Sequence, residues 1–171
     1  MGPALDVFNR ERAAHGMGAL SEDPALTEAA NQQAREMALQ GQLTHVDDKG
    51  GTFVERAIGA QYSGQPRAEN LAWQQKSATH AATAWLNSPA HQHNILLPDV
   101  DDAGFGYACN PETGRFWVLV LGRRGQALLG PLISATPYRT DLAADKEIKA
   151  AQIVRVRRRQ GPRPGRAGRP E

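Results

Sequence analysis

Two short stretches in the middle of this chain hold most of the side chains that could do chemistry. The first runs from Glu69 to Trp73, and the second runs from Trp85 to Ile95. Together they supply a carboxylate, two indole rings and the imidazole of His91. A carboxylate and an imidazole serve as acid–base pairs and as ligands for divalent metals. By themselves, these residue types indicate a small α/β domain with a His/Glu site.

The neighbouring histidines do not extend this site. His93 follows His91 by two positions, which is about 200° around a helix, so the two side chains should lie on nearly opposite faces. We therefore expect His93 at the surface, and we expect His80 to be solvated on another helix. Ser88 and Pro89 form a cap-then-proline signature, so we expect the Ser88 oxygen to accept backbone N–H groups at a helix start.

The order of the motifs resembles the CAP superfamily (cysteine-rich secretory, antigen 5 and pathogenesis-related proteins), in its cysteine-poor bacterial branch. The resemblance covers about residues 4–122, and the ordered set of motifs is more specific than any one of them. The matching stretches are residues 8–13, 26–37, Thr44-His45, 69–72, 85–95 and Gly104-Phe105-Gly106-Tyr107.

This resemblance implies an α+β fold, in which a small antiparallel sheet lies between helices as a three-layer α-β-α sandwich. Many members carry a cleft tetrad of two histidines and two glutamates. By motif position, His45 resembles the first histidine, Glu69 the first glutamate and His91 the second histidine. The second glutamate position is Ser88 here, so only three of the four tetrad residues are present.

Three kinds of chemistry are open to such a cleft. His45, Glu69 and His91 could bind Zn²⁺ or another divalent cation weakly and leave a position for water. They could instead form a hydrogen-bonded polar cleft with help from Asn70 and Asn94. A Ser88-His91-Glu69 hydrolase group fits by residue type, but no G-x-S-x-G elbow surrounds the serine.

The resemblance further implies a binding or interaction module, usually extracytoplasmic, whose ligand could be a lipid, a peptide or a glycan. The alternative is a metal- or Ser-assisted hydrolase, similar to a protease, that uses the same cleft. We favour the module, which requires no cofactor. No signal peptide is visible in residues 1–8, and no apolar run approaches the length that spans a membrane.

The surrounding elements can be predicted from local patterns. Apolar spacing and capping residues predict five helices, over residues 4–15, 24–40, 53–58, 77–85 and 89–96. Extended structure is expected over residues 69–74, and a hairpin is expected from residues 103–109 and 116–121. We expect the three tryptophans in the core and cleft wall, Glu55-Arg56 as a surface pair, and Cys109 as a buried, inert thiol.

The chain has 171 residues and divides by composition. We expect the CAP-like domain over residues 1–122, a partly ordered extension over 123–154 and a disordered Arg/Pro/Gly-rich tail over 155–171. The tail holds seven arginines and one glutamate, a formal charge of +6. Such a tail should bind anionic polymers or surfaces nonspecifically. The single cysteine excludes an intramolecular disulfide.

Overall fold

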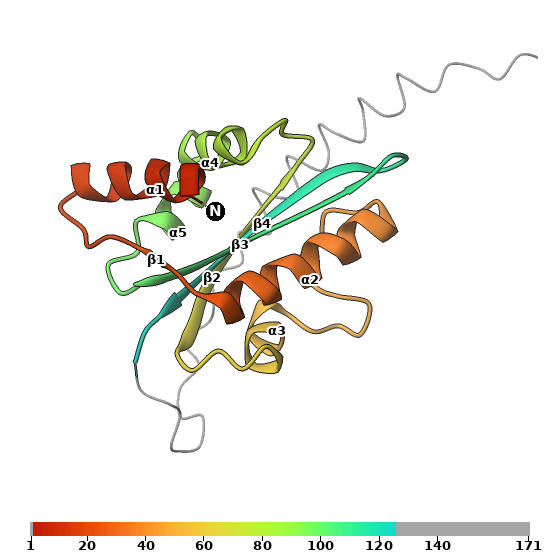
Figure 1. Cartoon of the computed structure of the whole chain (residues 1–171), viewed down its shortest axis with the longest axis horizontal. Coiled ribbons are helices and arrows are strands. Elements are labelled where there is room, and N and C mark those ends of the chain that lie inside the picture. Colours follow the sequence, from red (N-terminus) through yellow and green to blue (C-terminus); the bar gives the residue numbers. More distant parts are fainter. Residues whose placement is uncertain (1, 126–171) are drawn as a thin grey trace, which may run out of the picture. The chain divides into compact units, whose positions relative to one another are not determined.

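Local sequence signals set the helix boundaries in the computed structural model, which describes residues 2–125. Asp23 caps the second helix by accepting from the N–H groups of Ala25 and Leu26, and Gly41 ends it in the left-handed conformation. All five predicted helices and the hairpin are confirmed (Figure 1). The elements are α1 (Gly2–Ala14), β1 (Ser21–Glu22), α2 (Pro24–Gln40), α3 (Phe53–Gly59), β2 (Gln65–Trp73), α4 (Ala78–Leu86), α5 (Pro89–Ile95), β3 (Asp102–Asn110) and β4 (Gly114–Arg123).

The described elements form the α-β-α sandwich that the family resemblance predicts. The sheet has the order β1-β3-β4-β2. Helices α2 and α3 pack on one face, and α1 and α4 lie on the other (Figure 1). The expected antiparallel sheet is confirmed for β2, β3 and β4, whereas the short β1 pairs with β3 in parallel. This leaves β2 as an edge strand.

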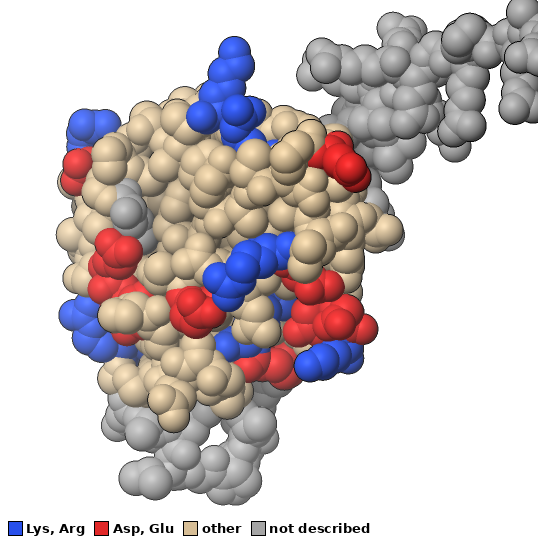
Figure 2. Space-filling model, turned by 45° about the vertical axis from the view of Figure 1, so that its right-hand side comes forward, with Lys and Arg blue, Asp and Glu red and all other residues tan. Residues whose placement is uncertain are grey.

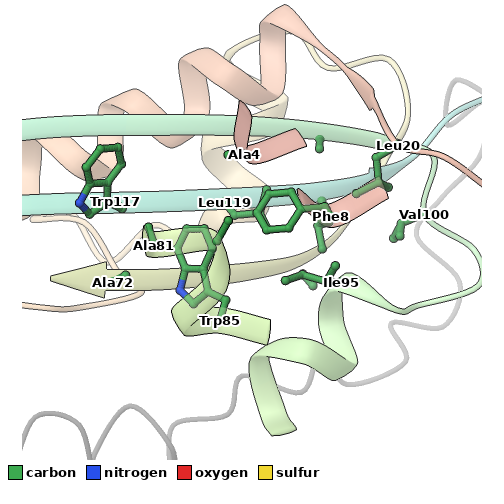
Figure 3. Packing of buried hydrophobic residues seen from close by; sticks show 14 residues of the cluster. Ala4, Phe8, Leu20, Ala72, Ala81, Trp85, Ile95, Val100, Trp117 and Leu119 are labelled. Atoms are coloured by element: carbon green, nitrogen blue, oxygen red, sulfur yellow. The ribbon is translucent and has the colours of Figure 1, made fainter. Parts of the chain in front are cut away.

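Alternation along β4 divides the core between the two faces. Leu119 and Leu121 belong to the cluster under α1 and α4, while Val118 and Val120 belong to the cluster under α2 and α3. On the α1 side, Phe8 packs against Trp85 with ring centroids 6.2 Å apart. Figure 3 shows these two rings beside Leu119.

The two glycines of the Gly-Phe-Gly-Tyr motif allow α2 to lie directly on β3. A Cβ atom on Gly104 would come within 2.0 Å of the Leu26 carbonyl carbon. A Cβ atom on Gly106 would come within 2.3 Å of the Ala30 carbonyl carbon. The motif therefore sets the close packing of the first helical layer on the sheet.

The expectation that Cys109 is buried is wrong, because its side chain is exposed. The hairpin of β3 and β4 runs past α1 and α4 (Figure 1), so its far end lacks their cover. Tyr107, two positions earlier on the same strand, is also 43% exposed. An apolar run predicts a strand correctly but does not report how far the neighbouring helices extend.

Among the described helices, none is long and apolar enough to cross a membrane. Residues 126–154 of the predicted partly ordered extension, and the whole of the predicted disordered tail over 155–171, lie outside the described residues. The domain boundary at residue 122 therefore stays a prediction.

Candidate functional site

The candidate site is built on two consecutive residues of the edge strand β2. Side chains alternate along a strand, so Glu69 and Asn70 point to opposite faces of the sheet. Glu69 contacts Arg56 of α3, whereas Asn70 contacts Asn94 of α5. One strand thus carries two clusters of polar residues, which approach it from the two helical layers.

The first cluster, formed by His45, Arg56 and Glu69, is buried. Nδ1 of His45 lies 2.8 Å from Oε1 of Glu69. Nη2 of Arg56 donates to the other carboxylate oxygen, Oε2, at 2.6 Å. The side chains of Arg56 and Glu69 are each 1% exposed. In the neutral His45 ring the hydrogen belongs on Nδ1, because an ionised carboxylate can only accept.

The loop between α2 and α3 is fixed on both sides of His45. Nε2 of Gln33, a fully buried residue of α2, donates to the carbonyl oxygens of Thr44 and Val46. The Arg56 guanidinium also lies 3.5 Å from the His45 carbonyl oxygen. The imidazole is therefore held by contacts to its own backbone and to that of its neighbours.

Sequence reasoning missed the role of Arg56, which is buried rather than part of a surface pair. Glu55 instead closes a capping box with Thr52, and the hydrogen bonds from Thr52 lower the pKa of Glu55. The box fixes the residue at which α3 begins, and this determines which side chains face inward. The buried residues of the helix are Phe53, Arg56 and Ala57. A Thr-x-x-Glu signature followed by i, i+3, i+4 spacing was the signal that could have placed Arg56 inward.

The second cluster joins α5 to β2. Oγ of Ser88 lies 2.8 Å from Nδ1 of His91. Nδ2 of Asn70 donates to the His91 carbonyl oxygen at 3.0 Å, and Nδ2 of Asn94 donates to Oδ1 of Asn70 at 2.8 Å. Asn70 and Asn94 thus lie beside His91, although no described contact joins either of them to His45.

The expected cap at Ser88 is only half right. Ser88 occupies the N-cap position of α5 with extended backbone angles, and Pro89 follows at the first helical position. Its side chain makes no capping hydrogen bond, because the hydroxyl turns to the imidazole of His91. His80 and His93 are exposed, as predicted.

The tryptophans act as structural residues in the described fold. Trp85 and Trp117 are 2% and 7% exposed, and Trp73 is half-buried. Each indole N–H donates to a backbone carbonyl oxygen, at 2.8 Å for Trp73, 2.9 Å for Trp85 and 3.0 Å for Trp117. Trp85 binds the carbonyl of Leu71 and so ties α4 to β2. The expected core position is confirmed for Trp85 and Trp117, whereas the expected place in a cleft wall stays a prediction.

A second arginine that sequence reasoning missed supports the segment after α5. Arg12 of α1 is 1% exposed. It donates to the carbonyl oxygens of Ile95 at 2.8 Å, Leu97 at 2.9 Å and Val100 at 3.0 Å. Burial lowers the pKa of Arg12, and the nearby charge of Asp101 partly opposes this shift. Helix α1 therefore anchors the chain just beyond the His91 helix.

The structure distributes the predicted site residues over two pairs. Glu69 contacts His45, while Ser88 contacts His91. The proposed Ser88-His91-Glu69 relay would need Glu69 to orient His91, yet the carboxylate contacts His45 and Arg56. Within residues 2–125, no three His, Cys, Asp or Glu side chains are grouped so that they could hold a metal ion.

Comparison with known families identifies the chain. The family model described as the cysteine-rich secretory protein family, CAP, matches residues 5–121. The chain belongs to this family. The match ends two residues before the end of β4, so it includes both polar clusters.

Two curated proteins of Bacillus subtilis (strain 168) are similar to this CAP chain. The uncharacterized protein YkwD is 28% identical over 113 residues, which cover 66% of this chain and 43% of YkwD. The uncharacterized membrane protein YlbC is 29% identical over 102 residues, which cover 60% of this chain and 30% of YlbC. The chain thus spans less than half the length of these relatives.

Solved structures show the same fold. An extracellular protein of Bacillus anthracis that contains an SCP domain superposes with a TM-score of 0.63 at 24% identity, covering 72% of this chain and 40% of that one. An outer surface protein of Borrelia burgdorferi also gives 0.63, at 23% identity, covering 71% of this chain and 90% of that one. At this level of identity the likeness establishes the CAP fold alone.

Proposed function

We propose that this CAP domain is an extracytoplasmic binding module that holds a lipid, peptide or glycan ligand and does not catalyse a reaction. The support comes from family membership and from the use of the polar residues within the fold. The edge strand β2, with polar clusters on both of its faces, is where we place the ligand.

One observation carries the choice of a module over a hydrolase. Both oxygens of Glu69 are bound, one by Arg56 and one by His45. A serine hydrolase requires its histidine to contact the nucleophile with one nitrogen and an orienting acid with the other. Here Ser88 contacts the Nδ1 atom of His91, and Glu69 serves a different histidine. Within residues 2–125, the carboxylate that this relay would need is therefore engaged by His45 and Arg56.

The hydrolase alternative rests on the Ser88–His91 contact and can be tested directly. Purified protein, Ser88→Ala and a matched control, Ser77→Ala, should show no turnover of p-nitrophenyl esters or labelled casein above buffer. Ser77 is the control because it caps α4 with its hydroxyl and does not contact His91. Turnover that is present in the wild type and in Ser77→Ala but lost in Ser88→Ala would establish the hydrolase instead.

Ligand binding is tested on the same proteins. Native mass spectrometry after incubation with a bacterial lipid extract, a mixed peptide pool or a fragmented cell-wall glycan should show one retained class. Asn70→Ala should weaken retention, because it removes the link between β2 and the His91 carbonyl. Retention of none of the three classes at millimolar ligand would contradict the proposed function.

The extracytoplasmic location is supported by the two structural neighbours, of which one is an extracellular protein and the other an outer surface protein. Fractionation of the source cells with an antibody to residues 2–125 should find the protein in the medium or the cell envelope. Co-fractionation with a cytosolic marker enzyme would overturn this assignment.

A further inference from the structure

The buried carboxylate of Glu69 requires a positive charge close by. Moving a carboxylate from water into a protein interior costs several kcal/mol unless a cation compensates it. In clusters of histidines and carboxylates, a divalent metal ion supplies that charge. Here a side chain of the same protein lies in contact with it, because Nη2 of Arg56 is 2.6 Å from Oε2.

The donor set around Glu69 does not fit a metal centre. Both oxygens of Glu69 already have a partner, Arg56 on Oε2 and His45 on Oε1, and a cation bound to this carboxylate would lie beside the fixed positive charge of the guanidinium. The family position that would supply a second carboxylate is Ser88, which contacts His91. Consistent with this, the described part of the chain groups no three potential ligands.

We infer that Arg56 takes the place of the divalent cation, so that the His45–Glu69 cluster of this chain works without metal. The guanidinium is a permanent part of the chain and cannot exchange with the medium. Its Nη1 atom donates to the Gly51 carbonyl at 3.0 Å, and it lies against the His45 carbonyl. The charge and the imidazole are therefore fixed to the same loop.

Arg56 acts on His45 through Glu69 and is thus a positioning residue. By holding Oε2, it orients the carboxylate so that Oε1 accepts from Nδ1 of His45. This fixes the neutral ring in one tautomer, with Nε2 as the unprotonated nitrogen. The inference goes beyond the proposed binding function, because the module could bind its ligand with or without a metal.

The first test uses the wild-type full chain. Long-range ¹H–¹⁵N NMR of the imidazoles at neutral pH should report the Nδ1–H tautomer for His45. One equivalent of ZnCl₂ should leave the His45 signals in place, and EDTA should change the melting temperature by no more than about 1 °C. Zinc that binds at the exposed His80 or His93 would leave the His45 signals unshifted as well, and this result would agree with the inference. One-to-one zinc binding that shifts His45 and disappears in Glu69→Gln would overturn the inference.

The second test removes the built-in charge. Arg56→Gln should bind zinc at least about tenfold more tightly than the wild type, because the carboxylate then lacks its cation. Arg56→Lys, the matched control, keeps a positive charge and should resemble the wild type in calorimetry. Equal zinc affinity of the wild type and Arg56→Gln would contradict the inference. If the Gln variant does not fold, the wild-type NMR titration decides the question alone.

Discussion

At the scale of single residues, Tyr62 shows how a buried polar side chain stabilises the sheet next to the site. Its hydroxyl donates to Oδ2 of Asp102 at 3.0 Å, and Nε of Arg124 donates to the other carboxylate oxygen at 2.9 Å. Burial is the main cause that raises the pKa of Tyr62 above its ordinary value, and the Asp102 charge adds to it.

This shift predicts a specific alkaline sensitivity. Because the folded pKa is raised, stability from neutral Tyr62 is complete below about pH 10 and is lost as the pH rises above it, where the unfolded chain ionises. Tyr62→Phe should cost about 1 kcal/mol at pH 7 through the lost hydrogen bond. Its free energy of unfolding should fall less than that of the wild type between pH 9.5 and 11 in urea titrations. Parallel losses in both proteins would show that Tyr62 does not control this range.

At the scale of elements, the close packing of α2 on the sheet depends on the two glycines of β3, Gly104 and Gly106, which have no side chain. Gly106→Ala would place a Cβ atom within 2.3 Å of the Ala30 carbonyl carbon, so helix and strand would have to separate. We expect a loss of about 2–3 kcal/mol, as for other overpacked contacts, measured by chemical denaturation. Gly18→Ala is the control, because no atom lies within 4 Å of its added Cβ. Similar costs for both variants would refute close packing as the cause.

The same scale explains which parts of the structure could be predicted from sequence. Helix α2 was predictable because its start at Asp23-Pro24 and its end at Gly41 are set by residues inside the element. Local sequence could not predict that Arg56 points inward or that Ser88 contacts His91. A hydroxyl or a guanidinium binds the polar groups that lie near it in the assembled fold, and these come from other elements. The pairing of Glu69 with His45 followed only from the family resemblance, since 24 positions separate the two residues.

At the scale of the whole molecule, charge is divided between the described fold and the rest of the chain. Residues 2–125 carry 14 acidic and 10 basic side chains, whereas residues 155–171 carry seven arginines and one glutamate. Figure 2 shows a broad uncharged area on one face of the described part, with most of the visible acidic groups gathered below it. We propose that the arginine-rich tail supplies nonspecific binding of anionic polymers or surfaces and no stability to the fold.

Truncation separates these two contributions. A chain that ends at Val154 should melt within about 2 °C of the full chain, because a segment this rich in arginine, proline and glycine has little apolar surface to bury. It should also lose most of its salt-sensitive retention on heparin and on anionic vesicles. Replacing the seven tail arginines by glutamine is the control that keeps chain length. A large fall in melting temperature on truncation would show that the tail packs on the fold, and retained heparin binding would place the anion site elsewhere.

The exposed end of the β3–β4 hairpin has a practical consequence. Cys109 is the only thiol of the chain, and it is accessible in the folded protein. A maleimide dye will therefore attach at one known position without mutagenesis. This position lies on β3, the strand whose glycines contact α2. The same accessibility means that air oxidation can join two chains during purification. A dimer that disappears with reducing agent should thus be read as a product of handling before it is taken for an assembly.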